Sequence, residues 1–206
     1  MLKKLLCHLS DGHFHSGEAL GEAMGVSRAA VWKQLKKLEE LEVPFSSVKG
    51  KGYRLHDPIE LLDEDAIRSA VSQRLDCLEL LLEVNSTNTY LFERASDHMG
   101  KRYAVLAEKQ SNGRGRRGRQ WISPFGRNIY LSLLVSFSGG MSALEGLSLT
   151  VGVAVEKALS RLGIDGVGLK WPNDVLLTGG KVAGILLESS GSGTFINWLS
   201  VGIGVN

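Results

Sequence analysis

The hydrophobic pattern changes at residues 56–60, and this change divides the chain into two parts that need different folds. Before it, apolar residues recur at helical spacing in three short segments, and two short alternating runs follow. After it, nearly continuous apolar runs typical of strands alternate with helical patterns. Pro58 disfavours helix at the residue before it. We therefore expect one domain at residues 1–57 and a second at residues 60–206.

The first domain is expected to contain three helices. Its first helix presents one apolar face made of Leu2, Leu5, Leu6 and Leu9. Ser16 is a plausible N-cap for the second helix and Ser27 for the third, and Gly25 between them permits a tight turn. The stripe expected to be buried on the second helix is Ala19, Leu20, Ala23 and Met24.

The third helix has a basic outer face, and the stretch FSSVKGKGYRL after it predicts a hairpin with a basic, glycine-rich tip. Helix, turn and basic helix followed by a hairpin wing is the pattern of a winged helix-turn-helix, which binds the DNA major groove. The residues expected to contact DNA are Ser27, Arg28, Trp32, Lys33, Lys36, Lys49 and Lys51. The alternative is a winged helix used only for protein contacts, in which Trp32 packs on a neighbouring helix.

The second domain is expected to be a mixed sheet flanked by helices, which gives the chain an α/β (α+β) fold class. Asp63 can cap a helix with Ile67, Ala70 and Val71 inside, Ser86 can start another, and a long helix is expected over 142–162. Gly179-Gly180 predicts a type I′ hairpin. The expected strands are LELLLEV, YAVLAEK, NIYLSLLV, VGLKW, NDVLLT, KVAGILLE and INWLSVGIGV.

Residues 111–128, SNGRGRRGRQWISPFGRN, interleave glycines with arginines and contain no acid. Glycines allow the backbone to approach a ligand closely, and arginines offer bidentate donors to phosphate. Repulsion among the clustered cations should keep the empty loop disordered, and a polyanion such as a nucleoside triphosphate would relieve it. The alternative is a nucleic-acid loop rich in arginine and glycine, but its place between two strands favours a ligand-ordered loop.

The totals are those of an ordinary globular protein: 206 residues, 43% hydrophobic, with a formal net charge of +2. Cys7 and Cys77 have neither metal-ligand spacing nor the density of a disulfide framework. The N-terminus lacks the cleavage site of a signal peptide, and no apolar run approaches the roughly 20 residues of a membrane span. These features favour a cytoplasmic protein without a membrane partner.

Five motifs in order resemble those of the biotin–protein ligases: STN at 86–88, GRGRRGRQWISPFGRNIYLS, KWPNDV at 170–175, GKVAGILLE at 180–188 and GIGVN at 202–206. HSGEALGEAMGVSRAAVWKQLKKL and VKGKGYRL resemble the DNA-binding domain of the bifunctional members, which also repress the biotin operon. The resemblance covers essentially the whole chain.

The resemblance implies a two-step reaction. Biotin attacks the α-phosphate of ATP to give biotinyl-AMP, and a lysine of a biotin carboxyl carrier protein then takes the biotinyl group. The first step brings two anions together, so positive charge and Mg²⁺ are expected. Operator DNA is a second implied partner. We expect biotinyl-AMP to order the arginine loop and support a homodimer whose two winged helices fit a palindromic site.

The resemblance also assigns roles to residues. Lys181 is the expected central catalytic residue, between the biotin carboxylate and the α-phosphate, with Arg114 and Arg116 beside it. Asp174 is a candidate Mg²⁺ ligand. The residues implied to contact biotin are Ser86, Thr87, Asn88, Gln110, Arg114, Gly115, Arg116 and Lys181. Those implied to contact the nucleotide are Arg117, Arg119, Trp121, Lys170, Asn173 and Asn206.

Plainer roles remain open for several of these residues. Ser86-Thr87-Asn88 can be a helix N-cap, and a helix start can present N–H groups to a ligand as well. Trp121 can be a core residue, Lys181 an exposed lysine after a turn, and Asn173-Asp174 a turn-stabilising pair.

Members of the family continue beyond the position of Asn206, with the rest of the catalytic domain and a small SH3-like domain. We therefore expect a fragment with impaired adenylation, in which INWLSVGIGVN leaves an exposed sheet edge. Two other functions stay open: a ligand-sensing regulator without catalysis, and a lipoate or octanoate ligase of related fold. An intact Lys181 and arginine loop argue against the first, and the winged helix and GRGRRGR argue against the second.

Overall fold

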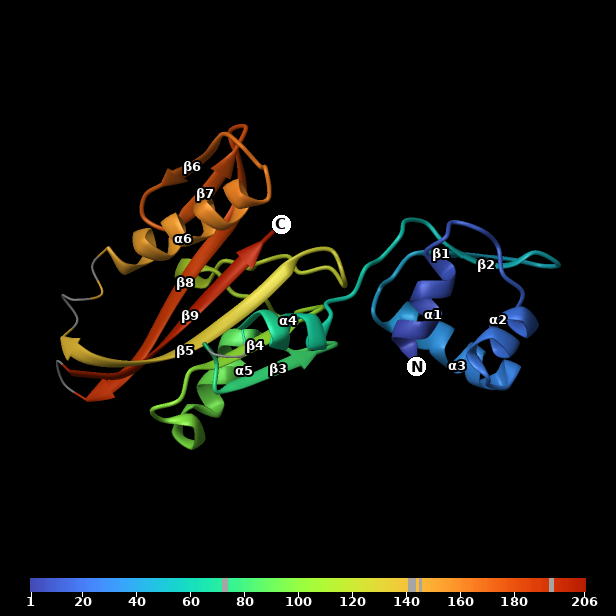
Figure 1. The fold of residues 1–206 in the computed structure, drawn as a ribbon, viewed down its shortest axis with the longest axis horizontal. Coiled ribbons are helices and arrows are strands. Elements are labelled where there is room, and N and C mark those ends of the chain that lie inside the picture. Colours follow the sequence, from blue (N-terminus) through green and yellow to red (C-terminus); the bar gives the residue numbers. More distant parts are fainter. Residues whose placement is uncertain (72–73, 141–143, 145, 193–194) are drawn as a thin grey trace. The chain divides into compact units, whose positions relative to one another are not determined.

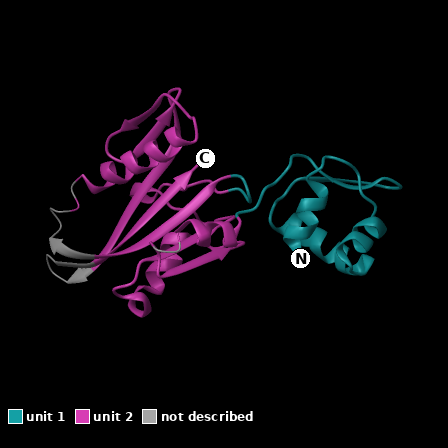
Figure 2. Ribbon diagram, viewed as in Figure 1, with its two compact units in different colours: residues 1–62, 124–127 teal, residues 63–123, 128–206 magenta. Residues whose placement is uncertain are grey.

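The computed structural model describes residues 1–71, 74–140, 144, 146–192 and 195–206. The chain forms two compact units, which Figure 2 distinguishes by colour. Unit 1 comprises Met1–Leu62 with Pro124–Arg127, and unit 2 comprises Asp63–Ser123 with Asn128–Asn206.

Unit 1 has the three helices and the hairpin that its sequence predicts: α1 (Leu2–Leu9), α2 (Gly17–Met24), α3 (Arg28–Glu40), β1 (Phe45–Val48) and β2 (Gly52–Leu55) (Figure 1). The side chains of Ser16 and Ser27 cap α2 and α3 by accepting hydrogen bonds from the N–H groups of Ala19 and Ala30. Gly25 ends α2 at φ 67°, a left-handed conformation that glycine adopts without strain. Both caps and the turn are therefore as expected.

The core of unit 1 contains the apolar face of α1, as predicted, and Val31, Leu35 and Leu38 of α3. On α2 the prediction is partly wrong, because Leu20 and Met24 are buried whereas Ala19 and Ala23 are exposed. The reason is a close approach at Gly21, where an added Cβ would lie 2.8 Å from the carbonyl oxygen of Val26. This approach turns the buried face of the helix toward Gly21.

Unit 2 is built on a seven-stranded mixed sheet in the order β3-β4-β5-β9-β8-β7-β6 (Figure 1). Only β3 and β4 pair in parallel, and the remaining neighbours are antiparallel. The mixed sheet is confirmed. The strands are β3 (Cys77–Leu81), β4 (Tyr103–Ala107), β5 (Ile129–Gly140), β6 (Val167–Lys170), β7 (Asp174–Leu177), β8 (Gly180–Ser192) and β9 (Phe195–Val205).

In the described part of unit 2, three α-helices accompany the sheet: α4 (Glu64–Val71), α5 (Thr87–Glu93) and α6 (Leu147–Arg161). Short 3-10 turns lie at Ala95–His98 and Arg116–Gly118. α5 packs on β4, β5 and β9, and α6 packs on β6, β7 and β8. Of the helix expected over 142–162, positions 142, 143 and 145 lie outside the described residues.

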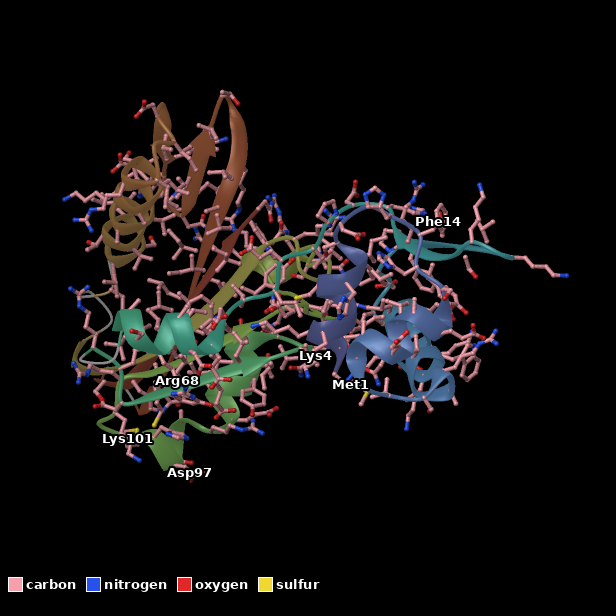
Figure 3. The ribbon with its side chains drawn as sticks, turned by 45° about the vertical axis from the view of Figure 1, so that its right-hand side comes forward. Met1, Lys4, Phe14, Arg68, Asp97 and Lys101 are labelled. Carbon is pink, nitrogen blue, oxygen red and sulfur yellow. The ribbon has the colours of Figure 1, made fainter. Side chains whose placement is uncertain are left out.

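Asp63 caps α4 as predicted, since its Oδ1 accepts a hydrogen bond from the N–H of Ala66. The expected inner face is only half right, because Ile67 and Val71 are half-buried and Ala70 is exposed. Arg68, labelled on α4 in Figure 3, donates to the carbonyl oxygen of Leu78 on β3 at 2.6 Å. This hydrogen bond therefore supplements the limited apolar packing of α4.

Two local expectations are wrong. β9 is not an edge strand, because it lies between β5 and β8 and pairs with both along its length. The tight turn before β8 falls one residue earlier than expected, since Leu177 pairs with Gly180 and the central residues are Thr178 (φ 48°) and Gly179 (φ 82°). Both φ values are positive, as a type I′ turn requires.

A half-buried acid in the middle of β3 stabilises unit 2. Glu79 on β3 accepts hydrogen bonds from the hydroxyls of Tyr103 (2.6 Å) and Tyr90 (2.7 Å). Burial raises the pKa of Glu79, but these two hydrogen bonds outweigh it and hold the pKa below its ordinary value. The guanidinium of Arg94 stacks 3.6 Å from the Tyr90 ring centroid and adds favourable charge. Within the described ranges, no helix has the length and apolar character of a membrane span.

Candidate functional site

Unit 2 contains a cavity of about 50 Å³ over the first half of β8 and the last residues of β9. Its walls come from the start of α5, the arginine loop and these two strands. The residues that line it are Ser86, Thr87, Asn88, Gln110, Arg114, Gly115, Trp121, Lys181, Gly184, Ile185, Leu186, Gly202, Ile203 and Gly204.

Glycines on the two central strands leave room for the ring of Trp121. A Cβ added at Gly204 would lie 2.6 Å from Cε2 of this ring, and one at Gly184 would lie 2.8 Å from Cζ3. Side chains at these positions would displace the ring. The indole Nε1 is buried and has no hydrogen-bond partner among the described residues. Trp121 therefore lies flat on the sheet and forms a wall of the cavity.

The start of α5 supplies a buried polar wall. Ser86 caps the helix, and Ser86, Thr87 and Asn88 are each less than 5% exposed. Oγ of Ser132 on β5 lies 2.8 Å from Oγ1 of Thr87 and 2.5 Å from Oδ1 of Asn88. Oγ of Ser200 on β9 donates to the same Asn88 oxygen at 3.1 Å. Ser86 therefore caps α5 and also lines the cavity with Thr87 and Asn88. The two roles are compatible, as the sequence led us to expect.

Gln110 joins this wall to the arginine loop. Its Oε1 accepts from the backbone N–H of Thr87 at 2.9 Å and from the Thr87 hydroxyl at 3.1 Å. Its Nε2 donates to Oγ of Ser123 at 3.0 Å. The amide therefore has fixed orientation, and its contacts connect both ends of the loop to α5.

The arginine loop has internal hydrogen bonds, from Gly115 N to Arg119 O at 2.7 Å and from Trp121 N to Gly113 O at 2.8 Å. Arg114 donates to Glu188 on β8 at 2.7 Å, and Arg116 donates to Oδ1 of Asn173 at 3.1 Å. Both partners lie outside the loop, which contains no acid of its own, and the expectation that the empty loop is disordered stays a prediction. Arg117 and Arg119 are exposed.

Lys181 and Asp174 face each other across the β7–β8 hairpin, with Nζ of the lysine 2.6 Å from Oδ1 of the aspartate. Nζ also lies 5.1 Å from the centroid of the Trp121 ring. Lys181 is therefore held at the cavity and is not a free turn lysine. In the parts of the chain that the structure describes, no group of three or more histidine, cysteine or acidic residues could hold a metal ion.

The other residues assigned to a nucleotide do not form one group. Trp121 lines the cavity with the residues assigned to biotin, whereas Asn173 borders a neighbouring hollow of about 520 Å³, which Arg116, Trp171 and Pro172 also line. Lys170 is exposed at the end of β6. Asn206 accepts a hydrogen bond from Asn128 at 3.1 Å, and its backbone N–H donates to Val182. The hollow beside Arg116 is the candidate place for a nucleotide.

Several residues of the site were missed from the sequence. Ser132 and Ser200 are polar side chains on buried strands, and Glu188 follows an apolar run. Glycines inside strands often mark a close approach of a ligand or another group, and that signal was available at Gly184, Gly202 and Gly204. All of these residues except Ser200 belong to motifs that were recognised without a role for each position.

Unit 1 has a separate polar groove of about 530 Å³ between α2, the start of α3 and the wing, lined by Arg28, Lys49 and Tyr53 among others. Trp32 is 57% exposed, with Nζ of Lys36 5.5 Å from its ring centroid. Lys33, Lys36, Lys49 and Lys51 are exposed, and Ser27 is the cap of α3. Two of these cations have acidic neighbours: Lys36 pairs with Glu39 at 2.6 Å and Arg28 lies 3.8 Å from Glu18.

Comparison with known proteins gives a consistent result for both units. Residues 81–206 match the profile of the Biotin/lipoate A/B protein ligase family, and residues 2–54 match that of an HTH domain. A bifunctional ligase/repressor BirA of Salmonella typhimurium is 44% identical over 98% of this chain, and its counterpart in Escherichia coli is 42% identical over 98%. The chain spans 62% of the length of each.

Solved structures agree with the sequence comparison. Biotin protein ligase from Leishmania major, in complex with biotinyl-5-AMP, is 33% identical, with a TM-score of 0.56 over 64% of this chain and 57% of that one. Biotin protein ligase from Aquifex aeolicus, in complex with biotin and ATP, is 38% identical, with a TM-score of 0.53 over 64% of this chain and 52% of that one.

Proposed function

The chain belongs to the Biotin/lipoate A/B protein ligase family, and from that premise we propose that it activates biotin with ATP and transfers it to a lysine of a biotin carboxyl carrier protein. One observation carries the proposal. Seven of the eight residues assigned to biotin line a single cavity together with Trp121. The eighth, Arg116, borders the adjoining hollow.

The cavity chemistry supports biotin as the ligand. A ureido ring needs both donors and acceptors, which the hydroxyls and amides of Thr87, Asn88 and Gln110 provide. Ile185, Leu186 and Ile203 offer apolar surface for the fused rings and the carbon chain. Lipoate lacks a ureido group and would offer these side chains neither the donors nor the acceptors that a ureido ring provides, so it would form fewer hydrogen bonds in the cavity. A lipoate or octanoate ligase is therefore the less favoured alternative.

In the proposed first step, an oxygen of the biotin carboxylate attacks the α-phosphorus of ATP, and the bond to the β-phosphate bridging oxygen breaks, releasing pyrophosphate. Lys181 would stabilise the charge that develops between carboxylate and phosphate, with Arg114 and Arg116 beside it. We assign Arg117, Arg119, Trp121, Lys170, Asn173 and Asn206 to the nucleotide. In the second step a carrier lysine amine attacks the biotinyl carbonyl and AMP leaves.

We assign Mg²⁺ to this reaction on the basis of donor chemistry. Asp174 offers a carboxylate beside Lys181, and Mg²⁺ is commonly bound by one or two carboxylates plus substrate phosphates. When bound, the ion would neutralise phosphate charge. A site composed of three or more acidic or histidine side chains is not required for that arrangement.

We further propose that unit 1 binds operator DNA and represses transcription when biotinyl-AMP accumulates. The capped α2–α3 turn, the exposed basic face of α3 and the basic wing support it. A homodimer formed with bound biotinyl-AMP would place two such units on a palindrome. Both activities use cytoplasmic partners, so we assign the protein to the cytoplasm. A regulator that senses ligand without catalysis remains the alternative.

The test of the ligase is biotin-dependent exchange of labelled pyrophosphate into ATP by the chain, with lipoate as the comparison. Exchange that requires biotin and is lost in Lys181→Ala supports the proposal. Biotin binding without exchange would favour the ligand-sensing regulator. Exchange that depends on lipoate instead would overturn the assignment of substrate.

A further inference from the structure

Behind the cavity wall, the side-chain amide of Asn88 spans three strands of the sheet. Its Nδ2 donates to Oε2 of Glu188 at 2.9 Å and to the carbonyl oxygen of Leu186 at 3.4 Å, both on β8. Its Oδ1 accepts from Oγ of Ser132 on β5 at 2.5 Å and from Oγ of Ser200 on β9 at 3.1 Å. Carboxylate and carbonyl oxygens can only accept, so the orientation of the amide is fixed.

β9 carries no side chain at the point where this amide lies. A Cβ added at Gly202 would lie 2.5 Å from Oδ1 of Asn88 and 2.8 Å from its Nδ2. Gly202 pairs with Ser132 on one side and with Leu186 on the other, so the amide follows one row of residues across the sheet. Ser132 and Ser200 are 0% exposed. Their hydroxyls therefore need partners inside the protein.

The single proton of the Ser132 hydroxyl is used within this network. A serine hydroxyl has one proton, and Oδ1 of Asn88 can only accept, so this proton goes to Asn88 along the short 2.5 Å contact. The 2.8 Å contact between Ser132 and the hydroxyl of Thr87 then uses a lone pair of Ser132. Toward Thr87, Ser132 is therefore an acceptor.

The hydroxyl of Thr87 meets a second acceptor in Gln110, whose Oε1 lies 3.1 Å away. The amide of Gln110 cannot be reversed, since its Oε1 accepts from the backbone N–H of Thr87 and its Nε2 donates to Ser123. The one proton of Thr87 thus lies between Ser132 and Gln110. Because Thr87 lines the cavity, what its hydroxyl has left for a ligand is a lone pair, which suits an N–H donor.

We propose that Ser132 and Ser200 are positioning residues that set the polarity of the cavity wall. Together they supply both donors to Asn88, and Ser132 also leaves Thr87 as a hydrogen-bond acceptor toward the cavity. A ligand with an N–H on an uncharged ring, such as a ureido nitrogen, is the group that such a wall selects. The choice of ligand rests on the function proposed above, whereas the network among the side chains does not.

The network is tested first without ligand, through the denaturant midpoint of the full chain. Ser132→Ala and Ser200→Ala each leave Oδ1 of Asn88 with one donor, and only the double variant leaves it with none. An unpaired buried oxygen is costly, so the midpoint shift of the double variant should exceed the sum of the two single shifts. Ser160→Ala, which removes an exposed hydroxyl on α6, is the control and should add to either serine variant without coupling.

The link from Ser132 to Thr87 is tested in the same way. Thr87→Val keeps the shape of the side chain and removes its hydroxyl. Ser132→Ala and Thr87→Val each remove the contact between the two hydroxyls, so their combined midpoint shift should be smaller than the sum of the single shifts.

The polarity is tested with two carbamate analogues of biotin, each with a ring oxygen in place of one of the two ureido N–H groups. In calorimetry the wild-type chain should bind one of them at least about tenfold more weakly than biotin, since an acceptor that faces an oxygen loses its hydrogen bond. In Thr87→Val this preference should fall below about twofold, because the acceptor is gone. In Ser132→Ala it should shrink about threefold, because the Thr87 hydroxyl can then turn. A merely structural serine would weaken biotin and the analogue alike.

The outcomes separate the parts of the proposal. Additive midpoint shifts for the two serines, or no coupling of Ser132 with Thr87, would overturn the network. Equal affinity of the wild-type chain for biotin and both carbamates would overturn the polarity, and a preference undiminished in Ser132→Ala would show that this serine does not set it. If the wild-type chain binds no biotin, the proposed function fails, and the midpoint shifts still decide whether the serines hold the wall.

Discussion

Nζ of Lys181 on β8 lies 2.6 Å from Oδ1 of Asp174 on the neighbouring strand β7. The bond fixes a cation whose sequence context, a lysine after a Gly-Gly pair, would otherwise indicate a flexible surface position. Lys181 also faces the ring of Trp121. This arrangement holds the lysine ammonium at the cavity, where the proposed adenylation needs it.

Lys181→Ala is expected to lower the rate of biotin-dependent pyrophosphate exchange by about 10²–10³, the loss typical of removing one preorganised charge donor. Biotin affinity should fall by less, because the polar wall at α5 remains. Steady-state exchange and calorimetry measure the two effects. Lys157→Ala, which removes an exposed lysine on α6, should change neither, and a comparable loss there would contradict the assignment.

Gly204→Ala is expected to weaken biotin binding by about tenfold or more, because a Cβ at 204 would displace the Trp121 ring that forms the cavity wall. Calorimetric titration measures the change. Gly168→Ala on β6 is the matched control, since its added Cβ meets no atom within 4 Å. Equal affinities for the two variants would show that Trp121 does not shape the binding site.

Ser132→Ala is expected to destabilise unit 2 by about 1–3 kcal/mol, the usual cost of leaving buried polar partners unsatisfied. The hydroxyl of Ser132 is fully buried between Thr87 and Asn88. Chemical denaturation followed by tryptophan fluorescence measures the free energy of unfolding. Ser160→Ala on α6, where the hydroxyl is exposed, should cost much less; an equal loss would argue against a polar network at the cavity.

Glu79→Gln is expected to lose stability at neutral pH and to approach the wild type as the solution becomes acidic. The pKa of Glu79 is held below its ordinary value of 4.5 in the folded state. The ionised carboxylate therefore contributes fully above pH 4.5, and this contribution is lost as pH falls through the folded pKa. Melting temperatures of both chains across this range test it, and a constant difference at every pH would contradict it.

Lys51→Ala in the wing is expected to weaken DNA binding almost uniformly across sequences and to reduce the slope of log K against log salt by about 1. Fluorescence anisotropy on a duplex selected by the protein from a random pool measures both. Lys4→Ala, on the exposed side of α1, is the control. If the two variants bind alike at every salt concentration, the wing does not contact phosphate.

Local chemistry made much of the fold predictable. Ser16, Ser27, Asp63 and Ser86 act as caps because the rule depends on one side chain and the N–H group three residues later. Apolar runs likewise located the strands. Their order was not accessible, because the sequence gives no sign that β9 inserts between β5 and β8. For the same reason, the expected exposed edge at β9 was wrong.

Site residues that belong to a recognised motif were predictable from the sequence. Contacts between residues far apart in the sequence were not. The family resemblance indicated Thr87, Gln110 and Lys181, and the structure places all three on one cavity. Glu188 lies 74 residues from Arg114, and no local pattern joins them. Trp121 was assigned to the nucleotide, but its place beside Gly184 and Gly204 depends on strand register, which residue types alone do not give.

The most direct test of the account is calorimetric titration of the chain with biotin and, separately, with lipoate. We predict saturable binding of one biotin per chain and at least about tenfold weaker binding of lipoate, because lipoate lacks the ureido donors and acceptors that the polar wall at α5 can bind. Absence of biotin binding, or equal affinity for the two acids, would contradict the central claim that this cavity recognises biotin.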